Sequence, residues 1–64
     1  MVSRMKIERV KSELSQSRLA DKARVYQVRI SRIERGATPF RDEAEAIAKA
    51  LGTRVEELFG ELPE

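Results

Sequence analysis

Hydrophobic residues recur along the chain at intervals of three and four positions, with polar residues between them. This spacing is typical of amphipathic helices, and the sequence lacks the alternating runs that indicate β-strands. The spacing predicts a first helix at about 4–12, a second at about 16–23, a third at about 27–35, a fourth that runs to Leu51 and a short fifth that ends near Gly60. We therefore expect an all-α fold, a compact five-helix domain that occupies residues 1–64 as one unit.

Residues that commonly cap helices stand at the ends of these segments. Ser3 and Ser15 precede the first and second helices, where a serine hydroxyl accepts a hydrogen bond from a free backbone N–H group. Gly36 and Gly52 follow the third and fourth helices, where glycine favours a left-handed stop. Two pairs with capping-box spacing are expected to start the fourth and fifth helices: Asp42 with Glu45, and Thr53 with Glu56.

The core is expected to take apolar residues from one side of each helix. On the first helix, Met5, Ile7 and Val10 are expected to face inward. The corresponding positions on the later segments are Leu19, Ala23, Val25, Ile30, Ile33, Ile47 and Leu51. Four residues near the end of the chain are predicted to form a dimer surface, to close the core, or to do both: Val55, Leu58, Phe59 and Leu62.

The third helix has two faces with different chemistry. At about 100° per residue, Ile30 and Ile33 point to one side, and Glu34 lies toward that buried side. The opposite face holds Val28, Ser31, Arg32 and Arg35, with Gln27 and Arg29 at its flanks. In a DNA major groove, arginine pairs with guanine, glutamine pairs with adenine, and a small apolar side chain meets the thymine methyl group. The outward face is therefore either a base-reading surface or a solvated face with one exposed valine.

Charge is segregated along the chain, although the net charge is only +2. Residues 14–41 carry a net charge of +5, from seven basic and two acidic side chains, whereas residues 42–64 carry −5. Such a distribution attracts a polyanion to the middle of the chain, although an unevenly charged solvated surface gives the same pattern.

Missing residue types narrow the range of functions. The sequence has no cysteine and no histidine, so thiolate metal sites and the commonest general base are absent. With no glycine-rich phosphate loop either, we expect no catalytic residue, no metal and no cofactor, and therefore not an enzyme. No apolar run approaches the roughly 20 residues that a membrane span requires, and no signal peptide is visible, so a cytoplasmic location is expected.

The second and third helices, joined by residues 24–26, have the spacing of a helix-turn-helix. Ser15 and Gln16 stand at the start of the second helix, where free backbone N–H groups and the helix dipole favour a phosphate. A phosphate contact of this kind would anchor the third helix in a groove.

The run LSQSRLADKARVYQVRISRIERG, residues 14–36, resembles the phage repressor and Cro-like helix-turn-helix family, also called the XRE family. AIAKALGTRVEELF, residues 46–59, resembles that family's fourth and fifth helices, so the resemblance covers about 5–59. It implies a lambda-repressor-like fold and a transcriptional regulator that binds double-stranded DNA sequence-specifically. We expect a homodimeric repressor on a near-palindromic operator. The alternative is an antitoxin or another protein-binding module of the same fold, with a protein partner such as a toxin.

The resemblance and the helix geometry together give the expected site. By resemblance, Gln16 contacts a phosphate and bonds to Gln27, and Arg9 pairs with Glu34 to tie the first helix to the third. The residues expected to read bases are Gln27, Val28, Arg29, Ser31 and Arg32. Those expected to contact phosphates are Gln16, Arg24, Tyr26, Arg35 and Arg41.

Three residues depart from the family pattern. Arg24 replaces the usual glycine of the turn, which costs about 1 kcal/mol where the turn has a positive φ. Tyr26 replaces the usual Ser or Thr cap of the third helix and so removes a hydrogen bond of about 1 kcal/mol. Its ring is expected to pack on the turn, or its hydroxyl to reach a phosphate. Arg29 stands where the family often has threonine and adds charge near the DNA.

Overall fold

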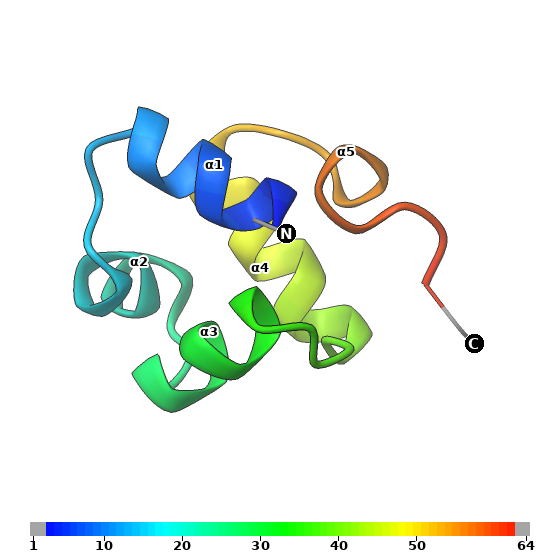
Figure 1. Cartoon of the computed structure of the whole chain (residues 1–64), viewed down its shortest axis with the longest axis horizontal. Coiled ribbons are helices and arrows are strands. Elements are labelled where there is room, and N and C mark those ends of the chain that lie inside the picture. Colours follow the sequence, from blue (N-terminus) through cyan, green and yellow to red (C-terminus); the bar gives the residue numbers. More distant parts are fainter. Residues whose placement is uncertain (1–2, 63–64) are drawn as a thin grey trace.

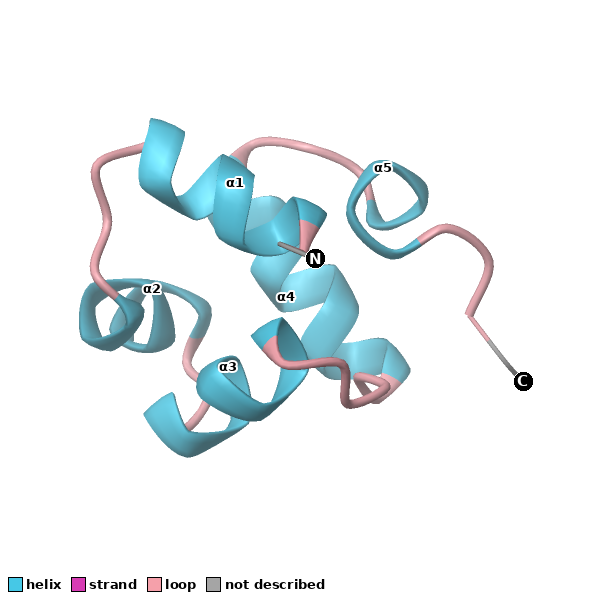
Figure 2. Ribbon diagram, in the orientation of Figure 1, coloured by secondary structure: helices cyan, strands magenta, loops and turns pink. Residues whose placement is uncertain are grey.

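The computed structural model describes residues 3–62, which form five helices and, within that range, no strand (Figures 1 and 2). The helices are α1 (Arg4–Lys11), α2 (Gln16–Ala23), α3 (Gln27–Glu34), α4 (Arg41–Leu51) and α5 (Val55–Phe59). The predicted all-α fold is confirmed. α1 and α3 each end one residue earlier than expected, because the chain leaves the helix at Ser12 and Arg35.

Serine hydroxyls start the first two helices as expected. Lys6 N donates to Ser3 Oγ at 3.1 Å, and Arg18 N donates to Ser15 Oγ at 3.0 Å. Each bond satisfies one of the four backbone N–H groups that a helix start leaves without an intrahelical partner. The ends of α1 and α2 differ in conformation, and the left-handed end of α2 shapes the turn described below.

The predicted cap of α4 is wrong. The helix begins at Arg41, and Phe40 is its N-cap residue. Glu43, three residues on, accepts a hydrogen bond from Phe40 N at 2.9 Å, so the glutamate half of a capping box is present without Asp42 or Glu45. Pro39 is buried just before the N-cap residue, and its ring fixes φ there, so the helix starts one residue ahead of Asp42.

The predicted cap of α5 is also displaced. The helix begins at Val55 with Arg54 as N-cap, so Thr53 lies one residue too early to cap it. Thr53 Oγ1 instead donates to Glu57 Oε2 at 2.6 Å, and the expected partner Glu56 is not used. The capping-box spacings in the sequence therefore did not locate the first residue of α4 or of α5.

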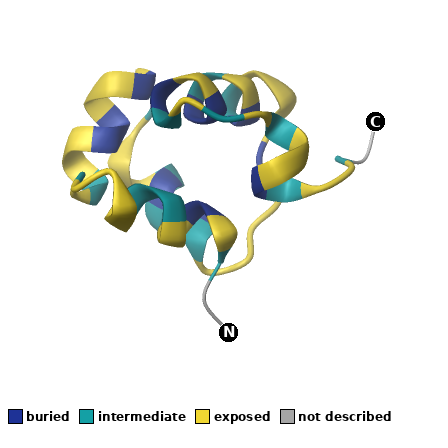
Figure 3. Cartoon of the chain, turned by 90° about the horizontal axis from the view of Figure 1, so that it is seen from above, coloured by how far each residue is buried: buried dark blue, intermediate teal, exposed yellow. Residues whose placement is uncertain are grey.

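Residues from every helix meet in one hydrophobic core. Met5, Leu19, Ile30 and Ile47 are at most 1% exposed, and Leu58 of α5 is also buried. α2 packs against α3 and α4, whereas α5 packs against α1 and α4. Figure 3 shows the buried positions on the sides of the helices that face one another. Three alanines let α4 approach its neighbours closely: Ala44, Ala48 and Ala50.

The expected inward positions on α1 are only partly correct. Met5 is buried, but Ile7 and Val10 are 42% and 57% exposed. At about 100° per residue, both lie more than a quarter turn from Met5, whereas Arg9 lies within about 40° of it. The inner face of α1 therefore consists of Met5 and Arg9, an apolar residue and an arginine that has a buried partner.

Candidate nucleic-acid interface

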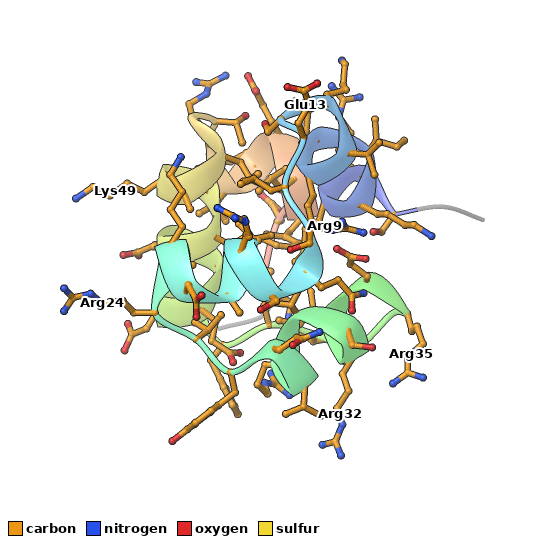
Figure 4. The ribbon with its side chains drawn as sticks, turned by 90° about the vertical axis from the view of Figure 1, so that its left-hand side faces the viewer. Arg9, Glu13, Arg24, Arg32, Arg35 and Lys49 are labelled. Carbon is orange, nitrogen blue, oxygen red and sulfur yellow. The ribbon has the colours of Figure 1, made fainter. Side chains whose placement is uncertain are left out.

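α3 presents one face to the core and the other to solvent. Ile30 and Ile33 are 0% and 4% exposed, whereas Val28 on the opposite side is 52% exposed. Arg32 and Arg35 are exposed and project from α3 away from the rest of the bundle (Figure 4). The face also carries Gln27, which is exposed, and Ser31, which is half-buried. The helix therefore holds a convex outer surface of valine, amide, hydroxyl and guanidinium groups.

α2 and α3 form a helix-turn-helix. α2 packs against α3, and the three residues between them form a tight reversal in which Val25 N donates to Ala20 O at 3.0 Å. Val25 is half-buried and packs against the core. Arg24 ends α2 in the left-handed conformation, with φ 59° and ψ 43°. The turn thus keeps the geometry that favours glycine, and Arg24 bears a cost of about 1 kcal/mol for it.

Tyr26 precedes α3 without capping it. The residue has extended backbone geometry and makes no side-chain hydrogen bond to the helix. Its side chain does not pack on the turn, because the residue is 80% exposed. The phenol is therefore free to meet a ligand beside the first turn of α3.

A buried ion pair joins α1 to α3. Arg9 Nε and Nη2 donate to the two carboxylate oxygens of Glu34 at 2.6 and 3.2 Å, and Arg9 Nη1 donates to Leu14 O at 2.8 Å. The side chains of Arg9 and Glu34 are only 11% and 4% exposed. A bidentate pair in which every guanidinium nitrogen donates a hydrogen bond offsets much of the cost of desolvating two charges. The pair therefore fixes the C-terminal end of α3 against α1.

Gln16 adds α2 to the same network. Its Nε2 donates to Glu34 Oε1 at 3.1 Å, so this donor is directed to Glu34 rather than to Gln27. The bond holds Gln16, the first residue of α2, beside the free N–H groups of that helix end. One glutamate thus sets the positions of α1, α2 and α3 relative to one another.

Arg29 is placed differently from the other residues expected to read bases. Its Nε and Nη2 each donate at 2.7 Å to a carboxylate oxygen of Glu43 on α4. Its guanidinium carbon lies 5.0 Å from the centroid of the Phe40 ring. The hydrogen bond from Arg29 is the largest cause of a lowered pKa at Glu43, and the same bond raises the pKa of Arg29 further.

Sequence reasoning missed Glu43 and Phe40 as partners of Arg29. The one signal available was the spacing from Phe40 to Glu43, which suits a helix start with a glutamate at its third position. That signal concerns the cap of α4 and gives no indication of a contact to α3. The contact depends on how the loop between α3 and α4 returns the chain beside Arg29.

The remaining basic candidates come from the end of α2, the end of α3 and the start of α4. Arg24, Arg35 and Arg41 are all exposed. Figure 4 shows Arg24 at one edge of the molecule and Arg35 near the other end of α3. Arg41 is the first residue of α4. α5 instead carries Glu56 and Glu57, both exposed, on the helix that packs on α1 and α4.

The four residues expected at a dimer surface separate into two groups. Leu58 is buried and closes the core. Val55, Phe59 and Leu62 are only half-buried. Phe59 and Leu62 line a groove of about 240 Å³ between α5 and the chain that follows α3, with Ile33 and Met5 at its base.

Two further observations bear on the class of site. Within residues 3–62, no cluster of three acidic, cysteine or histidine side chains is arranged to hold a metal ion. In the same range, no helix has the length and apolar character needed to cross a bilayer.

The comparison with known proteins gives one family. A family model described as helix-turn-helix matches residues 5–58, which is most of the chain. No curated protein and no solved structure shows a significant match. The matched segment contains α2, the turn with Arg24 and the outward face of α3, all in the register described above. The chain therefore belongs to the helix-turn-helix family of the XRE type, a family of DNA-binding proteins.

Proposed function

We propose that the protein is a sequence-specific regulator of transcription that binds double-stranded DNA as a homodimeric repressor on a near-palindromic operator. The observation that carries the proposal is the outer face of α3, where Val28 and Arg32 are exposed directly opposite the buried Ile30 and Ile33. A helix of this diameter fits the major groove, and these side chains match base edges.

Four residues of α3 read bases in this proposal: Gln27, Val28, Ser31 and Arg32. Arg32 donates to guanine and Gln27 pairs with adenine, while Val28 contacts a thymine methyl group. Arg29 is left out of this set, because Glu43 and Phe40 occupy its guanidinium group. The buried pair between Arg9 and Glu34 keeps α3 at a fixed angle, so the four side chains approach the groove together.

Phosphate contacts set the register of the helix in the groove. We assign them to residues that are exposed or stand at helix ends: Gln16, Arg24, Tyr26, Arg35 and Arg41. Gln16 acts at the first turn of α2, where free backbone N–H groups and the helix dipole also favour a phosphate. These contacts are independent of sequence and supply affinity that falls as salt rises.

A symmetric dimer would bring two copies of α3 to successive turns of one DNA face, about 34–36 Å apart. Val55, Phe59 and Leu62 supply the dimer surface in this proposal, because all three remain half-buried. Phe59 and Leu62 also line the groove described above. Leu58 acts only through the core.

Selection of bound sequences from random duplex DNA tests the proposal most directly. We expect a motif of two inverted half-sites whose centres are about one helical turn apart. Binding to the selected duplex should weaken steeply with salt. A selection that yields no motif, with affinity that is insensitive to salt, would contradict the proposal.

A protein-binding module of the same fold, such as an antitoxin, is the second candidate. It is favoured by Ile7 and Val10, which leave apolar side chains exposed on α1. Co-purification of the chain with the product of a neighbouring gene tests this candidate. A partner whose binding is unaffected by Val10→Asp would not use these side chains.

A further inference from the structure

Arg29 stands at the edge of the face that is proposed to meet DNA. It lies one helical turn before Arg32, so the two side chains are neighbours on the surface of α3. An unpaired arginine at this position would add a second positive charge beside the groove. In the structure its side chain is only 23% exposed, whereas Arg32 is exposed.

The guanidinium of Arg29 is occupied along its edge and over one face. Two parallel hydrogen bonds of 2.7 Å join it to both oxygens of Glu43, whose side chain is 14% exposed. The Phe40 ring covers the guanidinium at 5.0 Å from its centroid. Phe40 itself is 70% exposed, so most of its ring surface stays in solvent while one face meets Arg29.

Glu43 is held independently of Arg29. The carboxylate also accepts the backbone N–H of Phe40 at 2.9 Å, as the third residue of α4. The acceptor that binds Arg29 is therefore preorganised by the start of α4, and the pairing needs little further ordering of the glutamate.

We propose that Glu43 is a specificity-determining residue that withholds the Arg29 guanidinium from DNA. This inference rests on the proposed DNA-binding function. A free Arg29 would contact phosphate on any sequence, because phosphates carry no base information. It would raise binding to all duplexes and so reduce the ratio between operator and random DNA. Pairing with Glu43 removes that contact while base reading by Arg32 continues.

The test uses Glu43→Gln in the full chain. Glutamine keeps an acceptor for the Phe40 N–H group, so the start of α4 is retained, but the charged bidentate partner of Arg29 is lost. The matched control is the double variant Glu43→Gln with Arg29→Met, in which methionine keeps an unbranched stem against Phe40 and has no charge. Affinity for the selected operator and for a random duplex is measured from 50 to 200 mM salt.

For Glu43→Gln we expect one added phosphate contact per subunit. The plot of log affinity against log salt should steepen by about 0.9 per subunit, which is about a threefold larger loss per subunit over this salt range. Affinity for random duplex should rise at low salt, and the ratio of operator to random binding should fall. The double variant should return to the wild-type slope, because no guanidinium remains to be released.

Two results would overturn the inference. A wild-type slope in Glu43→Gln would show that the pair is only a structural link between α3 and α4. A steeper slope that persists in the double variant would show that the lost carboxylate acts by its own charge rather than through Arg29. Absence of DNA binding in the wild-type protein, by contrast, would refute the proposed function itself. Thermal unfolding of each variant confirms that the compared proteins are folded.

Discussion

Arg9 Nε lies 2.6 Å from Glu34 Oε2, and this contact joins the first helix to the C-terminal turn of α3 inside the protein. Both side chains are almost fully buried, and Gln16 and the Leu14 carbonyl take part in the same network. A charge in this position cannot be returned to water when its partner is removed. The pair therefore has consequences for stability that a surface ion pair does not have.

Glu34→Ala should lower the free energy of unfolding by about 3–5 kcal/mol, because it leaves the Arg9 guanidinium buried without its carboxylate. Urea unfolding followed by circular dichroism measures the loss. Arg54→Ala is the control, because Arg54 pairs with Glu57 at the surface, with side chains 77% and 51% exposed. That substitution should leave the unfolding midpoint unchanged. Equal effects of the two substitutions would mean that burial of the Arg9 pair has no energetic weight.

Arg24→Gly should stabilise the protein by about 0.5–1 kcal/mol. Arg24 has φ 59° and ψ 43°, a conformation that a side chain disfavours and glycine adopts freely. Arg24→Ala separates strain from charge, because alanine removes the guanidinium but keeps the Cβ atom. We expect the midpoint of thermal unfolding to rise for glycine and not for alanine. A rise of equal size in both variants would assign the gain to charge.

Tyr26→Ser should stabilise α3 by about 1 kcal/mol. Tyr26 stands at the N-cap with no side-chain hydrogen bond, and serine there accepts a bond from a backbone N–H group of the first turn. Little packing is lost, because Tyr26 is 80% exposed. Tyr26→Ala is the control, which should show no gain in urea unfolding. DNA affinity should fall in both variants if the phenol contacts a phosphate, as proposed.

The pattern of apolar residues was sufficient to predict the five helices and the outward face of α3. It failed on α1, where Val10 and Ile7 were expected inside and Arg9 was the residue that turned toward the core. Apolar periodicity cannot identify an inner face that contains a charged residue with a buried partner. Only the family resemblance predicted that Arg9 would pair with Glu34.

Neither the apolar pattern nor the family resemblance predicted the interaction of Arg29 with Glu43. Arg29 is a departure from the family pattern, and its partner lies 14 residues away across a loop. Sequence spacing predicts contacts within a helix, at three or four residues, but gives no register between α3 and α4. The position of Phe40 over the guanidinium depends on the same loop. The sequence predicted Arg29 as a base-reading residue and could not predict that its guanidinium pairs with Glu43 of α4.

Stability should fall in acid through Glu43. Its folded-state pKa lies below the ordinary value of 4.5, chiefly because Arg29 donates to it and because Phe40 N does so as well. A lowered folded pKa adds stability that is fully present above pH 4.5 and is lost as the pH falls through the folded pKa. Glu43→Gln should remove this part of the pH dependence. Urea midpoints measured from pH 6 downward should therefore converge for the two proteins in acid; parallel curves would contradict the assignment.

Arg32→Ala should relax the base preference at one position of each half-site. Arg32 is exposed on the face of α3 opposite Ile30, and no hydrogen bond or ion pair within the described residues engages its side chain. An arginine bidentate to guanine contributes about 1–3 kcal/mol of discrimination against the wrong base. The measurement is the affinity for the selected operator and for a duplex with that base pair exchanged.

Arg35→Ala is the matched control, because Arg35 is assigned to phosphate. It should weaken both duplexes equally and reduce the salt slope by about 0.9 per subunit. Arg32 is assigned to a base and Arg35 to a phosphate, so only Arg32→Ala should change the ratio of the two affinities. An equal loss on both duplexes for Arg32→Ala would make Arg32 a phosphate contact and leave base reading to Gln27, Val28 and Ser31.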